Sequence, residues 1–508
     1  MVSSVGERLV ITSPATGAVV GEADCSDPAA MPATVDAARE AGRDWEAMGF
    51  AGRTRVLLSA RRLLAERAES AIATIVAETG KPWEDAQSAE LTFGLLALGF
   101  WARRAEGFLC ERGRRIRSPL GLGRSASVAY SPCGVVGVIS PWNYPLALPL
   151  ADALPALMAG NAVVVKPSEL TPLSSIWIEG LFADAGMPPG VFSVAAGDAE
   201  VAAALIDAVD MVAFTGSSAT GAKVMERAAR TLTPVNLELG GKDAAIVFAD
   251  ADLGRAADRC VYYGMLNSGQ TCLSVERVFV EEPVHDRFLA LLADRVRLLR
   301  QGPPGGPGSV EIGAMAAPGQ HRIVTEHVEE ALAAGARVVV GGPGGGAPGE
   351  ERFHRPTVLA DVADEMRCMR EETFGPLLPV TRFSTEEEVL RRVNDCTYGL
   401  AATVFTADRD RWRRLAAGIE AGTVSLNEPV AHFALMDLPM NGWKDSGLGS
   451  RHGREGIRKF CRAKTIVGAR RGPSPAPHLY PFSRWRTRVI LTALRATFRR
   501  PRRGSGRS

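Results

Sequence analysis

The chain has 508 residues, of which 46% are hydrophobic and 23% charged, a composition ordinary for a globular protein with two or three domains. No apolar run approaches the roughly 20 residues that span a bilayer, and the charged N-terminus lacks an apolar signal core, so we expect a cytoplasmic protein. The net charge of +2 combines a body at −9 with eleven arginines, and no lysine or acid, in residues 470–508, which argues against nucleic acid as a partner of the folded domains.

The eight cysteines are scattered, with no CxxC pair and no metal-like spacing to histidine. A disulfide framework is not expected in a chain of this size, and a reducing cytoplasm fits the pattern better. We therefore expect no metal site, and we interpret seven of the cysteines as small buried side chains or bystanders. The exception is Cys272, whose surroundings suggest chemistry.

Residues 33–110 have the apolar spacing typical of helices. Between residues 114 and 132, two short strand-like pieces flank Pro119 and Gly121, which favours a β-hairpin.

From Gly134 to Val247, short apolar runs alternate with helical stretches such as Leu173–Ala185 and Thr220–Arg230. The runs are Val135–Ile139, Ala162–Val165, Val191–Val194, Met211–Phe214 and Ala244–Phe248. This alternation predicts an α/β fold with a parallel sheet, which places ligands at the carboxyl ends of its strands. A second α/β stretch runs from about Lys242 to Asn441.

The first of these strand ends leads into Ser140–Pro145, where two prolines bracket Trp142, Asn143 and Tyr144. The prolines predict a rigid strand-to-helix connection. The amide of Asn143 offers an N–H donor for a developing oxyanion. Taken alone, the segment is equally typical of a turn.

Further strand ends suit a nucleotide. Lys166 ends one strand and Glu169 follows it, so both can bind ribose hydroxyls. The small residues of Phe214–Gly221 would let a pyrophosphate approach a helix N-terminus. The GxGxxG fingerprint is absent, and each segment, like Glu371–Pro376, taken singly fits a plain strand end or turn better.

Glu238 ends a strand between two leucines and precedes Gly240 and Gly241. A carboxylate among apolar neighbours is desolvated, which raises its pKa toward the range of a general base. Cys272 lies 34 residues later, after Gly269-Gln270-Thr271, where backbone N–H groups can stabilise a thiolate or an oxyanion. A lone cysteine in such a turn would more often be structural.

In this order and spacing, the segments resemble the aldehyde dehydrogenase superfamily over roughly residues 8–468. The most specific part is Glu-Leu-Gly-Gly-Lys at 238–242, followed by Gly-Gln-Thr-Cys. The resemblance implies that Cys272 is the nucleophile, Glu238 the general base, and Asn143 with the Cys272 N–H the oxyanion hole. It also implies NAD(P)+ as cofactor, with contacts from Trp142, Lys166, Ser168, Glu169, Gly216, Ser217, Glu372 and Phe374.

The implied reaction converts an aldehyde to its acid through a thiohemiacetal and a thioester on Cys272. Glu238 favours hydrolysis over transfer to coenzyme A, because transfer to a thiol needs no water-activating base. Glu169 favours NAD+ over NADP+, since a carboxylate near the ribose 2′ position repels a phosphate; use of NADP+ stays open. An alternative of another class is a catalytically silent binding protein on the same fold.

The family fold implies a Rossmann-type cofactor-binding domain at 1–113 and 133–240 and a catalytic domain at 241–440. A β-hairpin oligomerisation arm would comprise 114–132 and 455–468. We therefore expect a homodimer or homotetramer.

The substrate pocket implied by the resemblance is apolar or aromatic, with Tyr144, Leu148, Leu266, Leu273 and Phe433 as its residues. Semialdehyde dehydrogenases usually place an arginine where this chain has Ala151 or Leu266. A buried substrate carboxylate without a cationic partner is costly, so we expect an apolar aliphatic or aromatic aldehyde. The sequence also resembles succinate-semialdehyde dehydrogenases, and succinate semialdehyde is the alternative.

The basic C-terminal extension, residues 470–508, contains an amphipathic helical pattern. Its apolar face has Ile490, Leu491, Leu494 and Phe498, and the adjoining face has Arg484, Arg488, Arg495 and Arg499. Such a helix at 480–500 either lies on an anionic membrane surface or packs on the acidic body or a neighbouring subunit.

Overall fold

The structure is a computed structural model, and it describes residues 3–5, 8–113, 116, 124–344, 352–469 and 480–498. The chain forms two compact units. The first consists of Met1–Leu109 and Ser131–Arg462, and the second of Cys110–Tyr130 and Ala463–Ser508. All candidate catalytic, cofactor and pocket residues belong to the first unit.

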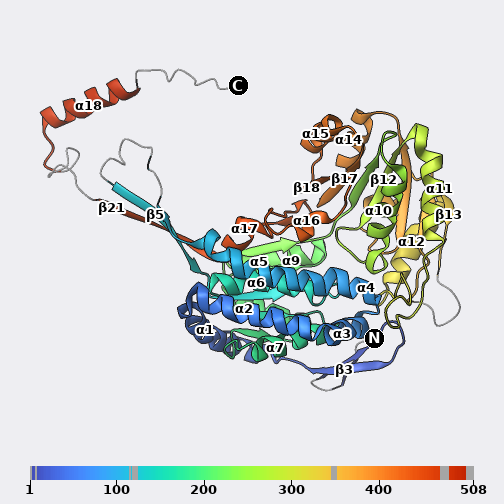
Figure 1. The fold of residues 1–508 in the computed structure, drawn as a ribbon. Coiled ribbons are helices and arrows are strands. Elements are labelled where there is room, and N and C mark those ends of the chain that lie inside the picture. Colours follow the sequence, from blue (N-terminus) through green and yellow to red (C-terminus); the bar gives the residue numbers. More distant parts are fainter. Residues whose placement is uncertain are drawn as a thin grey trace. The chain divides into compact units, whose positions relative to one another are not determined.

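The helices expected over residues 33–110 are present in the first unit (Figure 1). They are α1 (Met31–Ala47), α2 (Gly49–Glu66), α3 (Ala68–Thr79), α4 (Trp83–Asp85), the π-helical turn η2 (Ala86–Leu91) and α5 (Thr92–Leu109). Helix α5 packs between α2 and α6 (Ala147–Ala159), and α6 is buried along its whole length. A small antiparallel sheet of β1 (Ser3–Val5), β2 (Arg8–Thr12) and β3 (Val19–Asp24) was not predicted.

The first large sheet is the parallel sheet that the alternating runs predict. Its spatial order is β20 (Gly447–Leu448), β10 (Val235–Glu238), β9 (Met211–Thr215), β6 (Val135–Ile139), β7 (Ala162–Lys166) and β8 (Phe192–Val194). Only the pair of β20 with β10 is antiparallel in this sheet. From β7 to β10, successive strands of the sheet are connected by α7 (Leu173–Asp184), α8 (Ala199–Ala208) and α9 (Ser218–Ala229). Parallel strands end on the same side, so the polar segments after β6, β7, β9 and β10 share one edge.

One predicted run belongs to a different sheet from the one expected. The run at Ala244–Phe248 corresponds to β11 (Asp243–Val247), which lies in a second large sheet. That sheet has the order β13 (Arg337–Val340), β14 (Thr357–Ala360), β15 (Leu377–Phe383), β12 (Val275–Glu281), β11, β17 (Ala401–Phe405) and β18 (Thr423–Leu426). Ala244 and Ile246 enter one buried cluster, whereas Ala245 and Val247 enter another. Both faces of β11 are covered, so the run is apolar throughout and its pattern cannot assign it to either sheet.

The second sheet is flanked by the remaining helices of the first unit (Figure 1). The longer ones are α10 (Leu253–Met265), α11 (His285–Val296), α12 (Gln320–Ala333), α14 (Glu386–Asn394) and α15 (Arg409–Gly418). Short elements follow the site loops: η4 (Leu266–Gly269), α13 (Arg367–Arg370), α16 (Ala431–Ala434), α17 (Gly453–Arg458) and the pair of β16 (Tyr398–Gly399) with β19 (Trp443–Lys444).

The second unit contains a three-stranded sheet in the order β21, β5, β4. Strand β5 (Arg124–Pro132) pairs antiparallel with β4 (Arg112–Gly113), which lies just before the hairpin range expected at 114–132. The turn expected at Pro119 and Gly121 lies outside the described residues.

Strand β21 (Cys461–Ala469) covers most of the second predicted arm segment, and the expected C-terminal helix is α18 (Arg484–Phe498). Arg499 and residue 500 of the predicted helix fall outside the described residues. No helix in the described part of the chain is both long and apolar enough to cross a membrane.

Candidate functional site

Two cavities of the first unit meet at Cys272. One, which we call the apolar cavity, has a volume of about 230 Å³. The other, the strand-end cavity, has a volume of about 270 Å³. Leu148 of α6 also borders both. A thiol at this junction can contact molecules bound in either cavity.

The turn that presents Cys272, residues 266–272, has an unusual backbone. Asn267, Ser268 and Gly269 have φ values of 53°, 57° and 73°, so three consecutive residues adopt the left-handed conformation. For residues with a Cβ this conformation costs energy and persists only where the surroundings enforce it. The Asn267 N–H donates to Oδ2 of Asp85 at 2.8 Å, which is one such restraint. The sulfur position is therefore fixed by the backbone of this cysteine turn.

The Cys272 thiol is strongly held in its neutral form. Burial first, and then Glu372 and Asp243, raise its pKa to about 12. Arg451 acts in the opposite direction. Because the thiolate is the nucleophilic form, the reaction depends on the positive charge and proton acceptors around this thiol.

The two glycines after β10 let other segments approach closely. A Cβ on Gly240 would lie 2.4 Å from Oε2 of Glu372, and a Cβ on Gly241 would lie 2.4 Å from the carbonyl oxygen of Cys272. The Gly241 N–H also donates to Oε1 of Glu372 at 3.0 Å. The glycine pair that reads as a turn in the sequence thus brings the Glu372 carboxylate and the cysteine turn together.

Glu238 ends β10 and is 3% exposed. Neither of its carboxylate oxygens has a hydrogen-bond partner among the described residues. Burial raises the pKa of Glu238, and the positive charges of Arg451 and Lys459 oppose this rise. A desolvated carboxylate with free lone pairs is chemically suited to accept a proton.

Asn143 is fixed against the cysteine turn. Its Nδ2 donates to the carbonyl oxygen of Gln270 at 2.9 Å. The backbone carbonyl oxygen of Asn143 accepts from Nζ of Lys81 at 2.7 Å and from Nδ2 of Asn267 at 3.0 Å. Lys81 is fully buried and forms an ion pair with Glu90 at 2.5 Å. A buried ion pair between the loop after α3 and η2 therefore positions this asparagine.

Five of the eight predicted cofactor residues line the strand-end cavity, namely Trp142, Gly216, Ser217, Glu372 and Phe374. The rings of Trp142 and Phe374 meet edge to face, with their centroids 5.5 Å apart. Ser217 caps α9, and its hydroxyl accepts from the Thr220 N–H at 3.3 Å.

The other three predicted residues, Lys166, Ser168 and Glu169, lie at and after the end of β7 and do not line the strand-end cavity. Nζ of Lys166 and Oε2 of Glu169 form an ion pair at 3.4 Å. The Glu169 side chain is 46% exposed, whereas the Lys166 side chain is 7% exposed, so only the carboxylate of the pair is accessible.

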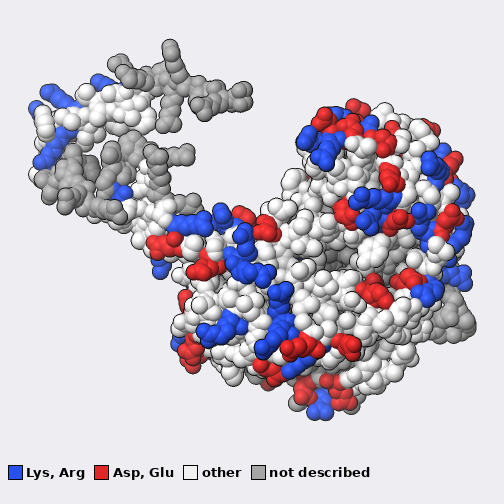
Figure 2. Space-filling model, in the orientation of Figure 1, with Lys and Arg blue, Asp and Glu red and all other residues white. Residues whose placement is uncertain are grey.

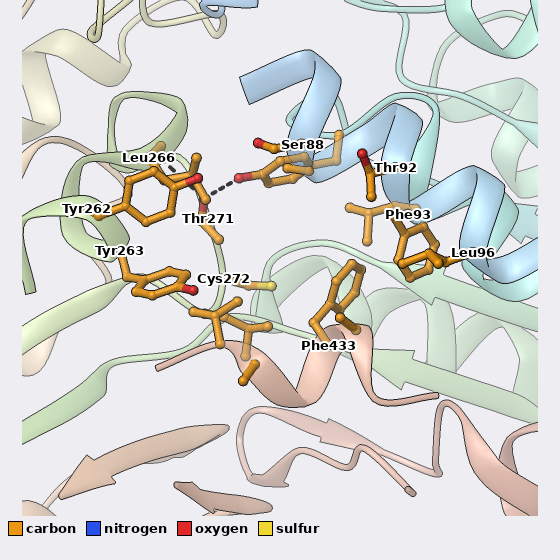
Figure 3. Close-up of a pocket in the computed structure, with 17 residues that line it drawn as sticks. Ser88, Thr92, Phe93, Leu96, Tyr262, Tyr263, Leu266, Thr271, Cys272 and Phe433 are labelled. Carbon is orange, nitrogen blue, oxygen red and sulfur yellow. Dashed lines mark hydrogen bonds between the residues drawn. The ribbon is translucent and has the colours of Figure 1, made fainter. Parts of the chain in front are cut away.

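The apolar cavity lies on the other side of Cys272, bordered by η2, α5, α10 and α16 (Figure 3). All five predicted pocket residues line it: Tyr144, Leu148, Leu266, Leu273 and Phe433. The Tyr144 hydroxyl and Oγ1 of Thr271 are 2.7 Å apart and share a hydrogen bond, which ties the cavity wall to the cysteine turn.

Further aromatic residues complete this cavity, and the sequence did not indicate them. They are Phe93 from α5 and Tyr262 and Tyr263 from α10. Phe93 stacks on Phe433 with a centroid distance of 4.6 Å. Every described residue that lines the apolar cavity is uncharged. Figure 2 likewise shows mainly uncharged side chains around the central hollow of the first unit.

Comparison with known proteins identifies the family. The sequence profile of the aldehyde dehydrogenase family matches residues 1–466. The chain belongs to this family. A betaine aldehyde dehydrogenase of Cereibacter sphaeroides is 37% identical over 478 residues, which cover 94% of this chain and 96% of the relative.

Two other aldehyde dehydrogenase relatives are similar over most of the chain. A Mycobacterium ulcerans protein provisionally named succinate-semialdehyde dehydrogenase (NADP+) 2 is 37% identical over 468 residues, covering 92% of this chain and 89% of its own length. The crystal structure of a Mycobacterium tuberculosis aldehyde dehydrogenase complexed with NAD+ has a TM-score of 0.85 at 34% identity, covering 91% of this chain and 95% of that one. The predicted α/β fold class, the enzyme class of NAD(P)+-dependent aldehyde dehydrogenase and the nicotinamide cofactor are thereby confirmed.

Buried charges that support the site loops of this aldehyde dehydrogenase were not predicted from the sequence. Lys242 pairs with Glu276 at 2.5 Å, and Glu276 accepts from the N–H groups of Thr373 and Phe374 at 2.8 and 2.9 Å. This pair fixes the loop that contains Glu372. The lysine after the double glycine is visible in the sequence, but its partner lies on β12 and no spacing rule connects the two.

Proposed function

We propose that this aldehyde dehydrogenase oxidises an aldehyde held in the apolar cavity, with Cys272 as nucleophile, Glu238 as general base and Asn143 as an oxyanion donor. The observation that supports the proposal most is the position of Cys272 at the junction of the two cavities. No other cysteine of the described residues borders either cavity. A panel of aldehydes, assayed with NAD+ and NADP+, tests the proposal; no NAD(P)H with any aldehyde would favour a catalytically silent protein.

In the proposed mechanism, the Cys272 thiolate forms a bond to the aldehyde carbon, and the carbonyl oxygen becomes an oxyanion. We assign Nδ2 of Asn143 and the Cys272 N–H as its donors. A nicotinamide cofactor held by the residues of the strand-end cavity would supply the oxidising power as the hydride acceptor, so that loss of the aldehyde hydrogen would leave the acyl group on Cys272 as a thioester. Glu238 takes a proton from water as the water oxygen attacks the acyl carbon. The carbon–sulfur bond then breaks, which restores the thiolate and releases the acid.

The residues around the strand-end cavity fit a dinucleotide. Gly216 leaves room before α9, a helix of 12 residues whose N-terminal N–H groups and dipole suit a pyrophosphate. Lys166, Ser168 and Glu169 offer donors and acceptors for the adenosine ribose at the end of β7. We assign Glu372 to the nicotinamide ribose, and Trp142 and Phe374 to the ring end of the cleft.

We propose NAD+ as the preferred cofactor, because the Glu169 carboxylate would repel a 2′-phosphate. The ratio of kcat/KM for NAD+ to kcat/KM for NADP+ tests this preference. Glu169→Gln, which keeps the size but removes the charge, should lower that ratio, whereas the exposed control Glu226→Gln should not. An unchanged ratio in Glu169→Gln would show that the charge of Glu169 does not determine the cofactor preference.

We propose an apolar aliphatic or aromatic aldehyde as the substrate. An ionised carboxylate in a cavity without charged lining residues would lose its hydration without gaining a partner. Comparison of kcat/KM for a medium-chain aldehyde, benzaldehyde and succinate semialdehyde tests the choice. A large preference for succinate semialdehyde would support the alternative substrate instead.

Release of the acid by hydrolysis, rather than by transfer to coenzyme A, follows from the buried Glu238 carboxylate. Pre-steady-state turnover with and without coenzyme A tests this point. Acceleration by coenzyme A, with an acyl-coenzyme A product, would overturn it.

We propose that residues 1–113 and 133–240 form the cofactor-binding domain and 241–440 the catalytic domain, since β10 is the last parallel strand of the first sheet and β11 the first strand of the second in chain order. Residues 114–132 and 455–468 are the proposed oligomerisation arm of a cytoplasmic homodimer or homotetramer. Light scattering of the full chain, and of a variant lacking residues after 462, measures the assembly. If both proteins form assemblies with the same number of chains, β21 does not contribute to oligomerisation.

For α18 we propose contact with an anionic membrane surface. None of its described residues is buried, and its sequence combines apolar residues with Arg484, Arg488 and Arg495. Co-sedimentation with vesicles of phosphatidylserine and phosphatidylcholine, with and without residues 475–508, tests the contact. Neutral vesicles are the control. Equal recovery of both proteins would favour packing on protein instead.

A further inference from the structure

A buried cluster of three charged side chains adjoins the strand that contains Glu238. Nη2 of Arg451 donates to Oδ2 of Asp152 at 2.6 Å and to Oγ1 of Thr215 at 2.8 Å. Nζ of Lys459 donates to Oδ1 of Asp152 at 2.9 Å. The side chains of Arg451 and Asp152 are each 2% exposed, and that of Lys459 is 11% exposed. Two cations share one carboxylate, so the cluster has an excess positive charge.

The register of the first sheet brings this cluster to Glu238. Thr215, which accepts from Arg451, ends β9 and is the parallel partner of Glu238 on β10. On the opposite side of β10, Gly447 of β20 is the antiparallel partner of Glu238. Arg451 lies three residues after the end of β20. The guanidinium is therefore fixed by elements that pack on both sides of Glu238.

The cluster is not fully satisfied internally. Nε of Arg451 is buried without a hydrogen-bond partner among the described residues, as are both carboxylate oxygens of Glu238. A cation that served only to stabilise the fold would be expected to have all its donors paired, because an unpaired buried donor is costly. Because Thr215, which accepts from the guanidinium, is the strand partner of Glu238, this unpaired donor indicates that the charge acts on Glu238.

The charged groups that act on Glu238 lie on α6 and just beyond the two ends of α17. Burial raises its pKa, Arg451 and Lys459 on either side of α17 lower it, and Asp152 of α6 raises it. For Asp152 itself, burial is outweighed by the two cations, which hold its pKa well below the usual range. Arg451 remains charged, because Asp152 and Glu238 outweigh the effect of burial and raise its pKa.

Arg451 also acts on the thiol. Burial raises the pKa of Cys272, and Glu372, Asp243 and Glu238 raise it further. Arg451 is the cation that opposes these four effects. One guanidinium thus favours the anionic form of two neighbouring groups that burial keeps neutral.

We propose that Arg451 is a positioning residue, which supplies the positive field in which Glu238 acts as a base and Cys272 as a thiolate. Asp152 and Thr215 fix its orientation, and Lys459 reinforces its charge. Because a guanidinium does not deprotonate in proteins, Arg451 acts as a fixed charge and does not relay protons. The inference rests on the proposed roles of Glu238 and Cys272.

The test compares two variants that remove charges of opposite sign, Arg451→Gln and Asp152→Asn. Arg451→Gln removes a positive charge, so thioester hydrolysis should require a higher pH, with its acid limb displaced upward by about one pH unit. Asp152→Asn removes a negative charge and should displace the same limb downward. A structural role alone would slow both variants without moving their pH profiles in opposite directions. Rapid-mixing measurement of the hydrolysis step between about pH 5 and about pH 9 provides the profiles.

A second measurement needs no aldehyde. The rate of Cys272 alkylation by iodoacetamide follows the thiolate fraction, so its pH profile should also move upward in Arg451→Gln. Arg451→Lys keeps the charge and should restore both profiles in part. Arg454→Gln, an exposed arginine of α17, is the matched control and should leave them unchanged.

Two outcomes overturn the proposal: unchanged profiles in Arg451→Gln, or displacements of the same sign in Arg451→Gln and Asp152→Asn. Should Arg451→Gln not fold, Lys459→Met takes its place, because this side chain is partly exposed, and an unmoved hydrolysis profile then overturns the proposal. If the protein oxidises no aldehyde but the alkylation profile still moves in Arg451→Gln, the proposed function fails while the effect of Arg451 on Cys272 stands.

Discussion

The two cavities that meet at Cys272 are built from different parts of the chain. The strand-end cavity is shaped by backbone at the ends of β6, β9 and β10, where Gly216 and Gly240 leave space. The apolar cavity is shaped by side chains from η2, α5, α10 and α16, with Phe93 stacked on Phe433.

This difference separates what the enzyme does from what it accepts. At Gly240 and Gly241 an added Cβ would fall 2.4 Å from another group, so the strand-end cavity allows little variation without loss of geometry. The apolar cavity is lined instead by side-chain atoms, including the stacked rings of Phe93 and Phe433. We therefore expect backbone packing to constrain the strand-end cavity, and side-chain identity to determine which aldehyde fits the apolar cavity.

Removal of the sulfur that joins the cavities should have the largest effect. Cys272→Ala lacks the nucleophile, so aldehyde oxidation should fall by roughly 10⁴-fold or more. Cofactor binding, followed by fluorescence titration, should persist because the strand-end cavity keeps its other residues. Cys25→Ala, in the N-terminal part of the same unit, should retain activity. Full steady-state turnover of Cys272→Ala would refute its role.

The next largest effect concerns the second half of the reaction. Glu238→Gln cannot accept a proton from water, so steady-state turnover should fall by about 10²- to 10⁴-fold. The first turnover should still produce a burst of NADH, since oxidation precedes hydrolysis. Rapid mixing measures both phases. Loss of the burst together with turnover would mean that Glu238 is needed before the acyl stage.

The same contrast explains what the sequence could predict. Gly240 and Gly241 form a recognisable pattern because the close approaches of Glu372 and of the Cys272 backbone leave no room for a Cβ at either place. The predicted parallel sheet followed from runs that are apolar on both faces. The same property hid the assignment of β11, because an entirely buried strand contains no information about which sheet it joins.

Residues that depend on tertiary contacts could not be predicted. Lys81 positions Asn143 from 62 residues away, and Arg451 meets Asp152 across 299 residues. Phe93 and Tyr263 face the apolar cavity from helices whose apolar spacing is equally typical of core residues. Neither local propensity nor periodicity identifies such partners.

A charged side chain placed in the apolar cavity should shift the substrate preference from a medium-chain aldehyde toward succinate semialdehyde. Leu266→Arg would offer a cation to a substrate carboxylate, so kcat/KM for succinate semialdehyde should rise by about 10- to 100-fold. For a medium-chain aldehyde it should fall by a similar factor, because the cavity loses apolar volume and gains a buried charge. Leu266→Met, of similar size and uncharged, is the matched control. Equal losses on both substrates would show that Leu266 does not face the reacting aldehyde.

The smallest effect should be on stability and should leave the strand-end cavity untouched. His432 on α16, next to Phe433, has both ring nitrogens buried without a hydrogen-bond partner among the described residues, and burial lowers its pKa to about 4 from 6.5. Because the folded-state pKa lies below that of the unfolded chain, protonation favours unfolding, and stability is lost as the pH falls from about 6.5 toward 4. His432→Phe removes this titration. Its free energy of unfolding, relative to that of the native protein, should therefore rise by at most about 2 kcal/mol as the pH is lowered from about 7 to about 5. Urea unfolding at both pH values measures the difference, and a pH-independent difference would mean that His432 gains access to water in the folded enzyme.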